Sequence, residues 1–290
     1  GTVHRTVWVT KKDFQMEFPG LIKAMDQPSI DGVNTYFVSR AAAQTGLKVA
    51  ISGLGGDELF GGYPGFKDIP KAVKFFSPVS NISVLGRGFR WITAPVLKYF
   101  TSPKYAGLLE YGGSWEGAYL LRRGMFMPWE LPGVLDADMA RKGWNELQPL
   151  VHLRETVRDI TPDSLKVSAL ELSWYMRNQL LRDADWAGMA HSLEIRVPLV
   201  DINVLRRLAP LFANYIPSKQ DMAQKLHKPL PAEILNRSKT GFSVPVRDWL
   251  TEGNAVCAAE HGLRGWAKVV KKYYEADTSS LRNSAAIINT

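Results

Sequence analysis

Residues 52–63 read SGLGGDELFGGY, and this stretch decides how the rest of the chain is interpreted. Five of its twelve residues are glycine, and two adjacent carboxylates, Asp57 and Glu58, stand in the middle. Glycine permits positive φ angles and a close approach of the backbone to a ligand, at a cost in chain entropy. A simple surface turn needs fewer glycines, so the composition predicts a turn that holds a ligand.

The residues before this stretch predict an α/β arrangement. KVAIS (48–52) is a short apolar run, typical of a fully buried parallel strand. Apolar spacing predicts a helix over 12–25 and a second over 34–45, which ends at Gly46. The first nine residues alternate, which predicts a strand with one buried face. Strand, helical segment, strand and glycine turn together form the order of a right-handed parallel crossover unit.

The rest of the chain predicts helices. The stretch 164–185 places a stripe of apolar residues on one helix face, which we expect to point into the core: Leu165, Ala169, Leu172, Met176 and Leu180. No convincing strand follows residue 66. Two strands do not form a stable parallel sheet alone, so we expect further strands upstream of residue 1. We therefore divide the chain into 1–66, the C-terminal part of an α/β nucleotide-binding sheet, and 67–290, a mainly α-helical remainder.

Composition narrows the class of protein. The chain has 290 residues and a formal net charge of +8, but its basic residues are scattered and form no stripe interleaved with aromatics. We therefore expect no nucleic-acid partner, and a basic nucleic-acid binder stays the weaker alternative. No apolar run is long enough for a membrane span, and the first residues lack a signal-peptide pattern. A single cysteine, Cys257, cannot form an internal disulfide, which favours the cytoplasm.

The glycine stretch is placed where α/β sheets bind ligands, just beyond the carboxyl end of a strand. Its small residues are expected to offer backbone N–H groups to an anion: Ser52, Gly53, Gly55 and Gly56. Asp57 and Glu58 either complement the N-terminus of a helix or bind Mg²⁺ together with phosphate oxygens. The stretch matches neither GxxxxGK(S/T) nor GxGxxG, so the residues alone predict an anion and a metal at a strand end.

SGLGGDELFGGYPGF (52–66) resembles the second nucleotide motif of the asparagine synthetase family, which includes β-lactam synthetase. LLRDADWAGMAHSLEIRVPLVD (180–201) and NRSKTGFSVPVRDWL (236–250) resemble the same family in the same order. The opening GTVHRTVWVT looks like the segment that follows the family's first motif. The resemblance covers essentially the whole chain. It implies the later part of a parallel-sheet ATP-pyrophosphatase (adenine nucleotide α-hydrolase-like) domain, followed by a mostly helical region.

Members of this family adenylate a carboxylate with ATP and Mg²⁺, release pyrophosphate, and let an amine attack the acyl-adenylate. The resemblance implies that the serine and glycines of the turn contact ATP and that Asp57, with Glu58 as a second candidate, holds Mg²⁺. Lys239, within RSKTGF, matches the family lysine expected to stabilise charge at the α-phosphate. From the sequence alone, an exposed loop lysine remains the alternative.

A second group of residues is assigned to the pocket for the acid substrate: Leu54, Arg182, Asp183, Glu194 and Arg196. For the four charged residues, and for Asp185, a structural role is the favoured alternative, with Glu194 and Arg196 as a candidate ion pair. His191 is expected to be a hydrogen-bonded structural histidine rather than a base.

Three departures from the family pattern limit the functional prediction. The first nucleotide motif, SGGxDS, is absent, and so is the N-terminal glutaminase domain that would supply ammonia from glutamine, so we expect this chain alone to be inactive or severely impaired. Leu54 stands where asparagine-forming members carry glutamate. The leading prediction is amidation of aspartate to asparagine. The alternatives are amidation of a sugar or peptide carboxylate and a catalytically inactive nucleotide-binding module, and the resemblance also admits a homodimer.

Overall fold

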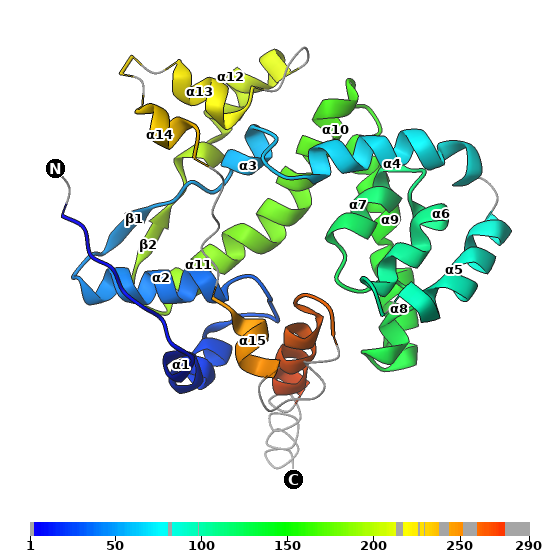
Figure 1. The fold of residues 1–290 in the computed structure, drawn as a ribbon, viewed down its shortest axis with the longest axis horizontal. Coiled ribbons are helices and arrows are strands. Elements are labelled where there is room, and N and C mark those ends of the chain that lie inside the picture. The colour runs from blue at the N-terminus through cyan, green and yellow to red at the C-terminus, as the bar shows by residue number, and fades with distance from the viewer. Residues whose placement is uncertain are drawn as a thin grey trace, which may run out of the picture. The chain divides into compact units, whose positions relative to one another are not determined.

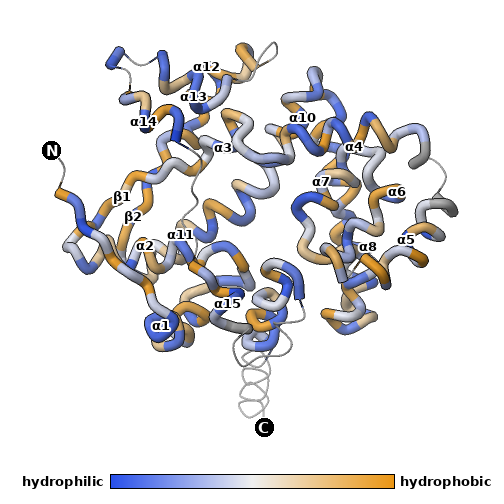
Figure 2. Tube along the Cα trace, viewed as in Figure 1, coloured by the Kyte–Doolittle hydropathy of each residue, from blue (hydrophilic) through white to orange (hydrophobic). Residues whose placement is uncertain are grey.

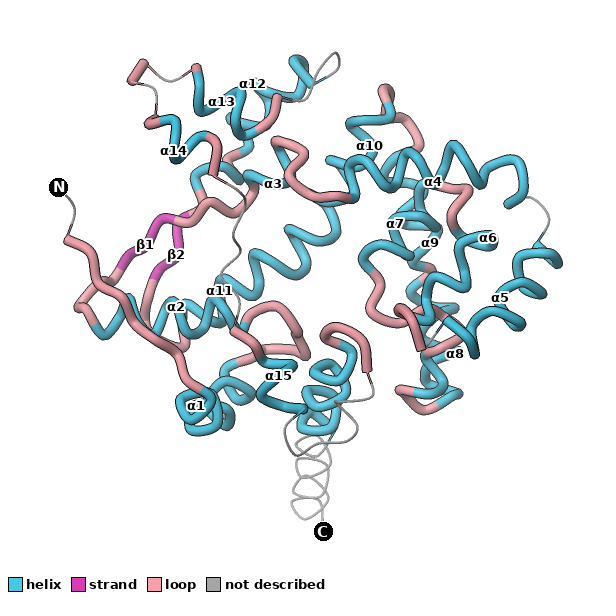
Figure 3. Tube along the Cα trace, in the orientation of Figure 1, coloured by secondary structure: helices cyan, strands magenta, loops and turns pink. Residues whose placement is uncertain are grey.

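Helices dominate the structure, a computed structural model that describes residues 3–80, 83–97, 99–212, 217–225, 227–228, 230–237, 244–251 and 260–275. Figure 3 shows that β1 (Val49–Ile51) and β2 (Glu194–Arg196) are the strands of this described part. The two strands pair in parallel. The fold is therefore mostly helical α/β with a small parallel sheet.

The chain forms two compact units, each built from separate stretches of sequence. The helices and strands that the two units contain are labelled in Figure 1. Unit 1 comprises Gly1–Ser52, Gln179–Arg196 and Thr240–Thr290. Unit 2 comprises Gly53–Asn178 and Val197–Lys239. The expected division into 1–66 and 67–290 concerns the domains of the family and stays a prediction.

Unit 1 contains the predicted helices upstream of the glycine stretch. The first, α1 (Lys11–Ala24), begins with a capping box, in which the hydroxyl of Thr10 accepts from the backbone N–H of Asp13. The second, α2 (Val33–Gln44), is followed by Gly46 at φ +87°. Both predicted helices are confirmed to within one residue. The unit also contains α11 (Leu181–Met189), α15 (Val246–Thr251) and a helix at 264–275.

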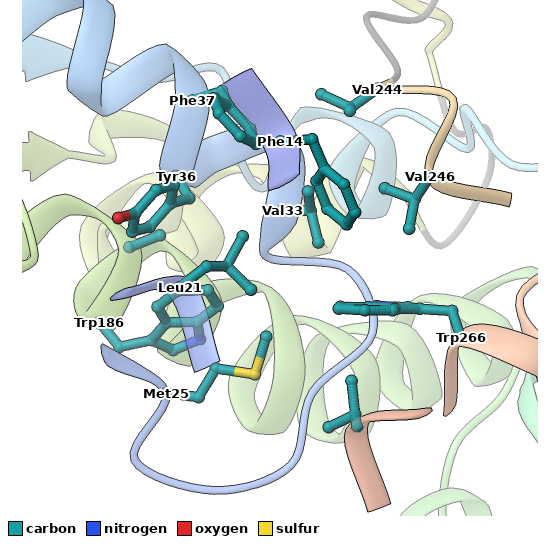
Figure 4. Packing of buried hydrophobic residues seen from close by; sticks show 12 residues of the cluster. Phe14, Leu21, Met25, Val33, Tyr36, Phe37, Trp186, Val244, Val246 and Trp266 are labelled. Carbon is teal, nitrogen blue, oxygen red and sulfur yellow. The ribbon is translucent and has the colours of Figure 1, made fainter. Parts of the chain in front are cut away.

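An aromatic cluster forms the core of unit 1 (Figure 4). Phe14 of α1 makes an edge contact with Trp266, at 6.2 Å between ring centroids, and Tyr36 of α2 lies 6.3 Å from Trp186 of α11. Gly32 is required here, since a β-carbon at this position would overlap the indole of Trp186. Each helix thus buries the apolar face that its sequence spacing predicted.

The small sheet corrects three predictions. Val49 pairs with Glu194 and Ile51 with Arg196, so the expectation of no strand after residue 66 is wrong. Ile51 is 79% exposed, so the expected full burial of KVAIS is also wrong for the described structure. Residues 3–10 form no strand, and Val3 is 93% exposed. Alternation predicts a strand only where a neighbour offers hydrogen bonds, and among the described residues β1 pairs with β2 instead.

The described residues of unit 2 form helices, turns and loops and no strand. Its α-helices are α3 (Gly56–Leu59), α4 (Gly65–Ser80), α5 (Ser83–Leu97), α6 (Leu108–Tyr111), α7 (Trp115–Arg123), α8 (Ala137–Leu147), α9 (Pro149–Val157), α10 (Asp163–Leu170), α12 (Ile202–Phe212), α13 (Lys219–Gln224) and α14 (Ala232–Leu235). Its 3₁₀ turns are η1 (Pro103–Gly107), η2 (Leu131–Gly133) and η4 (Pro198–Val200). A core around Ile69, Tyr119 and Leu170 joins α4, α7, α9 and α10.

A π-helical segment, η3 (Glu171–Leu180), follows α10. Of the predicted stripe Met176 is buried, whereas Val167, Leu170 and Glu171 take the interior positions. Leu165 and Ala169 are half-buried within α10, so the departure begins before the π-helix, whose wider turn affects only the residues beyond its start. The helix was predicted correctly, and its buried face only in part.

Apolar and polar residues are mixed along the described helices (Figure 2). In keeping with this, no helix of the described residues combines the length and the apolar character that crossing a membrane requires.

Candidate functional site

The glycine turn follows β1 directly in the chain, and Gly55 fixes its shape. Gly55 has φ +88° and ψ −19°, the left-handed conformation that glycine adopts at no steric cost. A β-carbon here would lie 3.0 Å from Cγ2 of Val200 and 3.3 Å from the carbonyl oxygen of Leu199. Gly53 is different, because its φ lies outside the left-handed range and a β-carbon would meet no described atom within 4 Å. The fold thus requires Gly55, but not Gly53.

Two of the four amides that the sequence assigned to an anion are already engaged. The N–H of Ser52 donates to the carbonyl of Arg196 at 2.8 Å, which extends the sheet, and the N–H of Gly56 donates to the carbonyl of Gly53 at 3.1 Å. These two amides are therefore not available to an anion in this conformation, and the contact of the four residues with ATP stays a prediction. Within the described part of the chain, the N–H groups of Gly53 and Gly55 donate to no protein atom. Gly53 is exposed, so its N–H is accessible to an anion, whereas Gly55 is buried and its N–H can take part only where a ligand reaches into the turn.

Asp57 lies in α3 beside a lysine that the sequence analysis missed. The Oδ1 of Asp57 is 2.6 Å from Nζ of Lys219, with the two side chains 21% and 51% exposed. Lys219 is the first residue of α13, which Ser218 caps by accepting from the backbone N–H of Asp221. The S-x-x-D pattern could have predicted this helix start. No local pattern could have predicted the pairing with Asp57.

The other carboxylate of the motif, Glu58, points into unit 2 rather than to solvent. It is 1% exposed, and its Oε1 accepts from the hydroxyl of Tyr63 at 2.8 Å. Its backbone carbonyl accepts from Oγ of Ser168 at 2.9 Å. A metal role for Glu58 stays a prediction, but its contacts are those of a residue that anchors α3. The neighbouring Asp57 is the more accessible of the two carboxylates.

A partly buried ion pair lies against the ring of Tyr63. The Nε of Arg123 donates to both carboxylate oxygens of Glu171, at 3.1 and 3.0 Å. The guanidinium lies over the rings of Tyr63 and Tyr175, 4.5 and 3.6 Å from their centroids. Burial raises the pKa of Glu171, and the Arg123 charge opposes that rise. Burial, with the charge of Glu58, also raises the pKa of Tyr63, so its hydroxyl remains a donor at neutral pH.

The residues assigned to the acid pocket have structural partners in unit 1. Arg182 pairs with Asp26 at 2.5 Å, and Arg196 donates to Glu194 at 2.9 Å on the exposed face of β2. Asp183 is 4% exposed and accepts from the indole N–H of the nearby Trp186 at 2.9 Å. The ion-pair alternative for Glu194 and Arg196 is confirmed, and the substrate role of all four residues stays a prediction.

The other residues singled out from the sequence lie in different places, and two of them lie outside the described residues. Leu54 is half-buried in unit 2, and Asp185 is exposed in unit 1. Lys239 and Cys257 lie outside the described residues. His191 packs edge-on against Tyr36 at 4.3 Å between ring centroids, but its buried Nε2 has no hydrogen-bond partner in the described structure. The expected hydrogen bond is therefore not made at this nitrogen, and the structural role of His191 stays a prediction.

The side chains that could act as metal ligands decide which metal ion the site can bind. The described residues contain no group of three or more His, Cys, Asp or Glu side chains that could hold a metal. A structural zinc or calcium site of that kind is therefore not formed by them. Mg²⁺ bound with a nucleotide needs only one or two carboxylates, since phosphate oxygens and water complete its shell. The accessible carboxylate of Asp57 fits that requirement.

Comparison with known proteins gives a consistent result. The family described as Asparagine synthase matches residues 1–280. Asparagine synthetase (glutamine-hydrolysing) 1 of Bacillus subtilis is 28% identical over 261 residues, which cover 83% of this chain and 38% of that protein. A provisionally named glutamine-hydrolysing asparagine synthetase of Mycobacterium tuberculosis is 28% identical over 260 residues, 87% of this chain and 38% of the relative. The chain thus spans 38% of the length of these relatives. No solved structure matches it.

Proposed function

Because the chain belongs to the asparagine synthase family, we propose that it performs the synthetase step of an ATP-dependent amidation. In this step an oxygen of the acid attacks the α-phosphorus of ATP and pyrophosphate leaves. Ammonia then attacks the acyl carbon of the acyl-adenylate, AMP leaves with the bonding electrons, and the nitrogen loses a proton to give the amide. Aspartate is the first acceptor to consider, since both relatives are named asparagine synthetases.

One observation carries this proposal, the unpaired backbone amides of the glycine turn. The N–H groups of Gly53 and Gly55 have no partner among the described residues, and Asp57 with Lys219 lies in the same unit. Free amides, a carboxylate and an ammonium group are the chemistry that binds a metal-bound polyphosphate. We propose that these groups bind the phosphates of ATP, as part of an ATP-pyrophosphatase-like fold.

Each residue has a distinct part in the proposed step. Asp57 would hold Mg²⁺, which neutralises phosphate charge and so makes pyrophosphate a better leaving group. Lys219 is paired with Asp57 in the free protein, and its ammonium group would move to phosphate oxygens when the metal takes that carboxylate. Lys239 is proposed to stabilise charge at the α-phosphate, on the strength of its motif alone.

The residues say less about which carboxylic acid is amidated than about the type of reaction. Leu54 is half-buried, close in sequence to the free amides, and its side chain offers no hydrogen bond to the ammonium group of free aspartate. This favours a second candidate, a sugar or peptide carboxylate. The ammonia would come from glutamine through a glutaminase domain, as the names of the relatives indicate for those proteins.

The full-length protein tests this function directly. ATP, Mg²⁺ and an ammonia source are supplied with one acid at a time, and pyrophosphate release is measured with and without the acid. Release that depends on aspartate supports asparagine formation, and release only with sugar or peptide acids supports the second candidate. ATP binding at micromolar concentration without release by any acid would instead identify an inactive nucleotide-binding module and refute the proposal.

A further inference from the structure

The short helix α3, which carries Asp57, is anchored on its buried side through the next residue. Glu58 is held twice, with its carboxylate accepting from the hydroxyl of Tyr63 and its backbone carbonyl accepting from Ser168. A helix of four residues has little stability of its own, because forming its first turn fixes several dihedral angles for one hydrogen bond. The position of α3 therefore depends on these anchors.

Tyr63 is itself fixed by a buried charge. Arg123 lies over its ring and over the ring of Tyr175, and Glu171 holds the guanidinium through Nε and through a 2.7 Å ion-pair contact to Nη2. A planar guanidinium that stacks on two rings and donates to a carboxylate leaves each partner little freedom. Tyr63, Arg123 and Glu171 thus form one connected cluster of side chains.

The same segment reaches Asp57 by a second route. The N–H of Gly62, the residue before Tyr63, donates to the backbone carbonyl of Asp57 at 2.9 Å. A β-carbon on Gly62 would overlap Oδ1 of Asp57, so the backbone of the segment lies directly against this carboxylate. Any shift of Tyr63 is therefore transmitted to Asp57 through Gly62 as well as through Glu58.

We propose that Tyr63, Arg123 and Glu171 are positioning residues, which hold α3 so that the carboxylate of Asp57 stays in place for the metal ion of the bound nucleotide. This rests on the proposed function, in which Asp57 binds Mg²⁺. In this proposal Tyr63, Arg123 and Glu171 do not contact substrate or metal. They set how well Asp57 binds the ion by limiting its motion before the ion arrives.

The test changes one hydroxyl group. Tyr63→Phe keeps the ring over Arg123 but leaves the carboxylate of Glu58 without its donor. We expect the Mg²⁺ concentration for half-maximal pyrophosphate release to rise about tenfold, the equivalent of one hydrogen bond to a charged group. Turnover at saturating Mg²⁺ should stay within about twofold, because the lost interaction acts on metal binding rather than on the transition state alone.

The matched control is Tyr36→Phe in unit 1. Tyr36 is buried, and its hydroxyl donates to the carboxylate of Glu17 at 2.9 Å, outside the cluster of Tyr63, Arg123 and Glu171. It should lower thermal stability by a similar amount without moving the Mg²⁺ dependence. If both variants move the Mg²⁺ dependence equally, or if Tyr63→Phe leaves it unchanged, the cluster is only structural and the inference is wrong.

A second variant tests the connection itself. Arg123→Lys keeps the charge but loses the flat stacking surface and the double hydrogen bond to Glu171. Arg123→Lys should raise the Mg²⁺ concentration needed for half-maximal release. In the Tyr63→Phe/Arg123→Lys double variant, the fold rise in this concentration should be smaller than the product of the two single fold rises. Multiplying effects would mean that the two residues act independently, against the inference.

A binding measurement distinguishes failure of the proposed function from failure of the positioning inference. If the wild-type protein releases no pyrophosphate with any acid, the proposed function fails. Binding of Mn²⁺ in the presence of ATP, followed by electron paramagnetic resonance, then takes the place of turnover. Weaker Mn²⁺ binding by Tyr63→Phe than by wild type and Tyr36→Phe supports positioning, and equal binding by all three overturns it.

Discussion

Three glycines allow the requirements of the fold to be separated from those of the ligand. Gly46 and Gly55 share the left-handed conformation, at φ +87° and +88°, but only Gly55 is crowded by neighbouring atoms. Gly53 has neither constraint. Alanine substitution at the three positions should therefore give three different results if the glycine turn binds ATP.

The expected magnitudes follow from these contacts. Gly46→Ala has only the cost of the left-handed backbone, about 1 kcal/mol of unfolding free energy. Gly55→Ala has the same cost and must also move Val200 and the carbonyl of Leu199, which adds about 1–3 kcal/mol. Gly53→Ala should be neutral or stabilise by up to about 1 kcal/mol, because alanine reduces the entropy of the unfolded chain. The side chain at 53 should nevertheless obstruct the nucleotide and weaken ATP binding about tenfold or more.

Two assays on the same samples check these values. Urea unfolding followed by tryptophan fluorescence gives each stability relative to wild type, and titration calorimetry with ATP and Mg²⁺ gives the dissociation constant. A loss at Gly55 no greater than that at Gly46 would refute the steric reasoning. Wild-type ATP affinity in a stable Gly53→Ala protein would refute the assignment of the turn to the nucleotide.

Three further predictions concern charged side chains. Lys219→Met removes the ammonium partner of the Asp57 carboxylate, so Mg²⁺ binding without nucleotide should tighten several-fold by calorimetry, with a stability change within about 1 kcal/mol because the pair is partly exposed. Weaker metal binding would contradict this. Burial raises the pKa of Asp183, so the folded state loses stability as pH rises through that pKa; Asp183→Asn should remove this loss, and urea unfolding between pH 4 and pH 8 measures it. A variant that is less stable at every pH would show that the ionised hydrogen bond outweighs burial. Lys239→Ala should lower pyrophosphate release far more than ATP affinity, and equal losses of both would remove this lysine from the chemistry.

The sequence by itself determined the features that depend on near neighbours. The apolar spacing of 12–25 and 34–45 predicts α1 and α2, because a helix is set by residues three and four apart. The glycines of 52–63 predict the sharp turn, since the left-handed conformation at Gly55 is a property of one residue. The motifs also indicate the family, which spans residues 1–280.

Only the tertiary structure decided which distant groups meet. β2 is three residues of which two are charged, so it has no strand pattern until β1 pairs with it. Ser168 reaches the carbonyl of Glu58 across 110 residues, and Lys219 reaches Asp57 across a longer separation still. Contacts of this kind depend on how the intervening helices close, which no local periodicity encodes. The local sequence therefore predicts the turn, whereas the partners of its carboxylates depend on the tertiary fold.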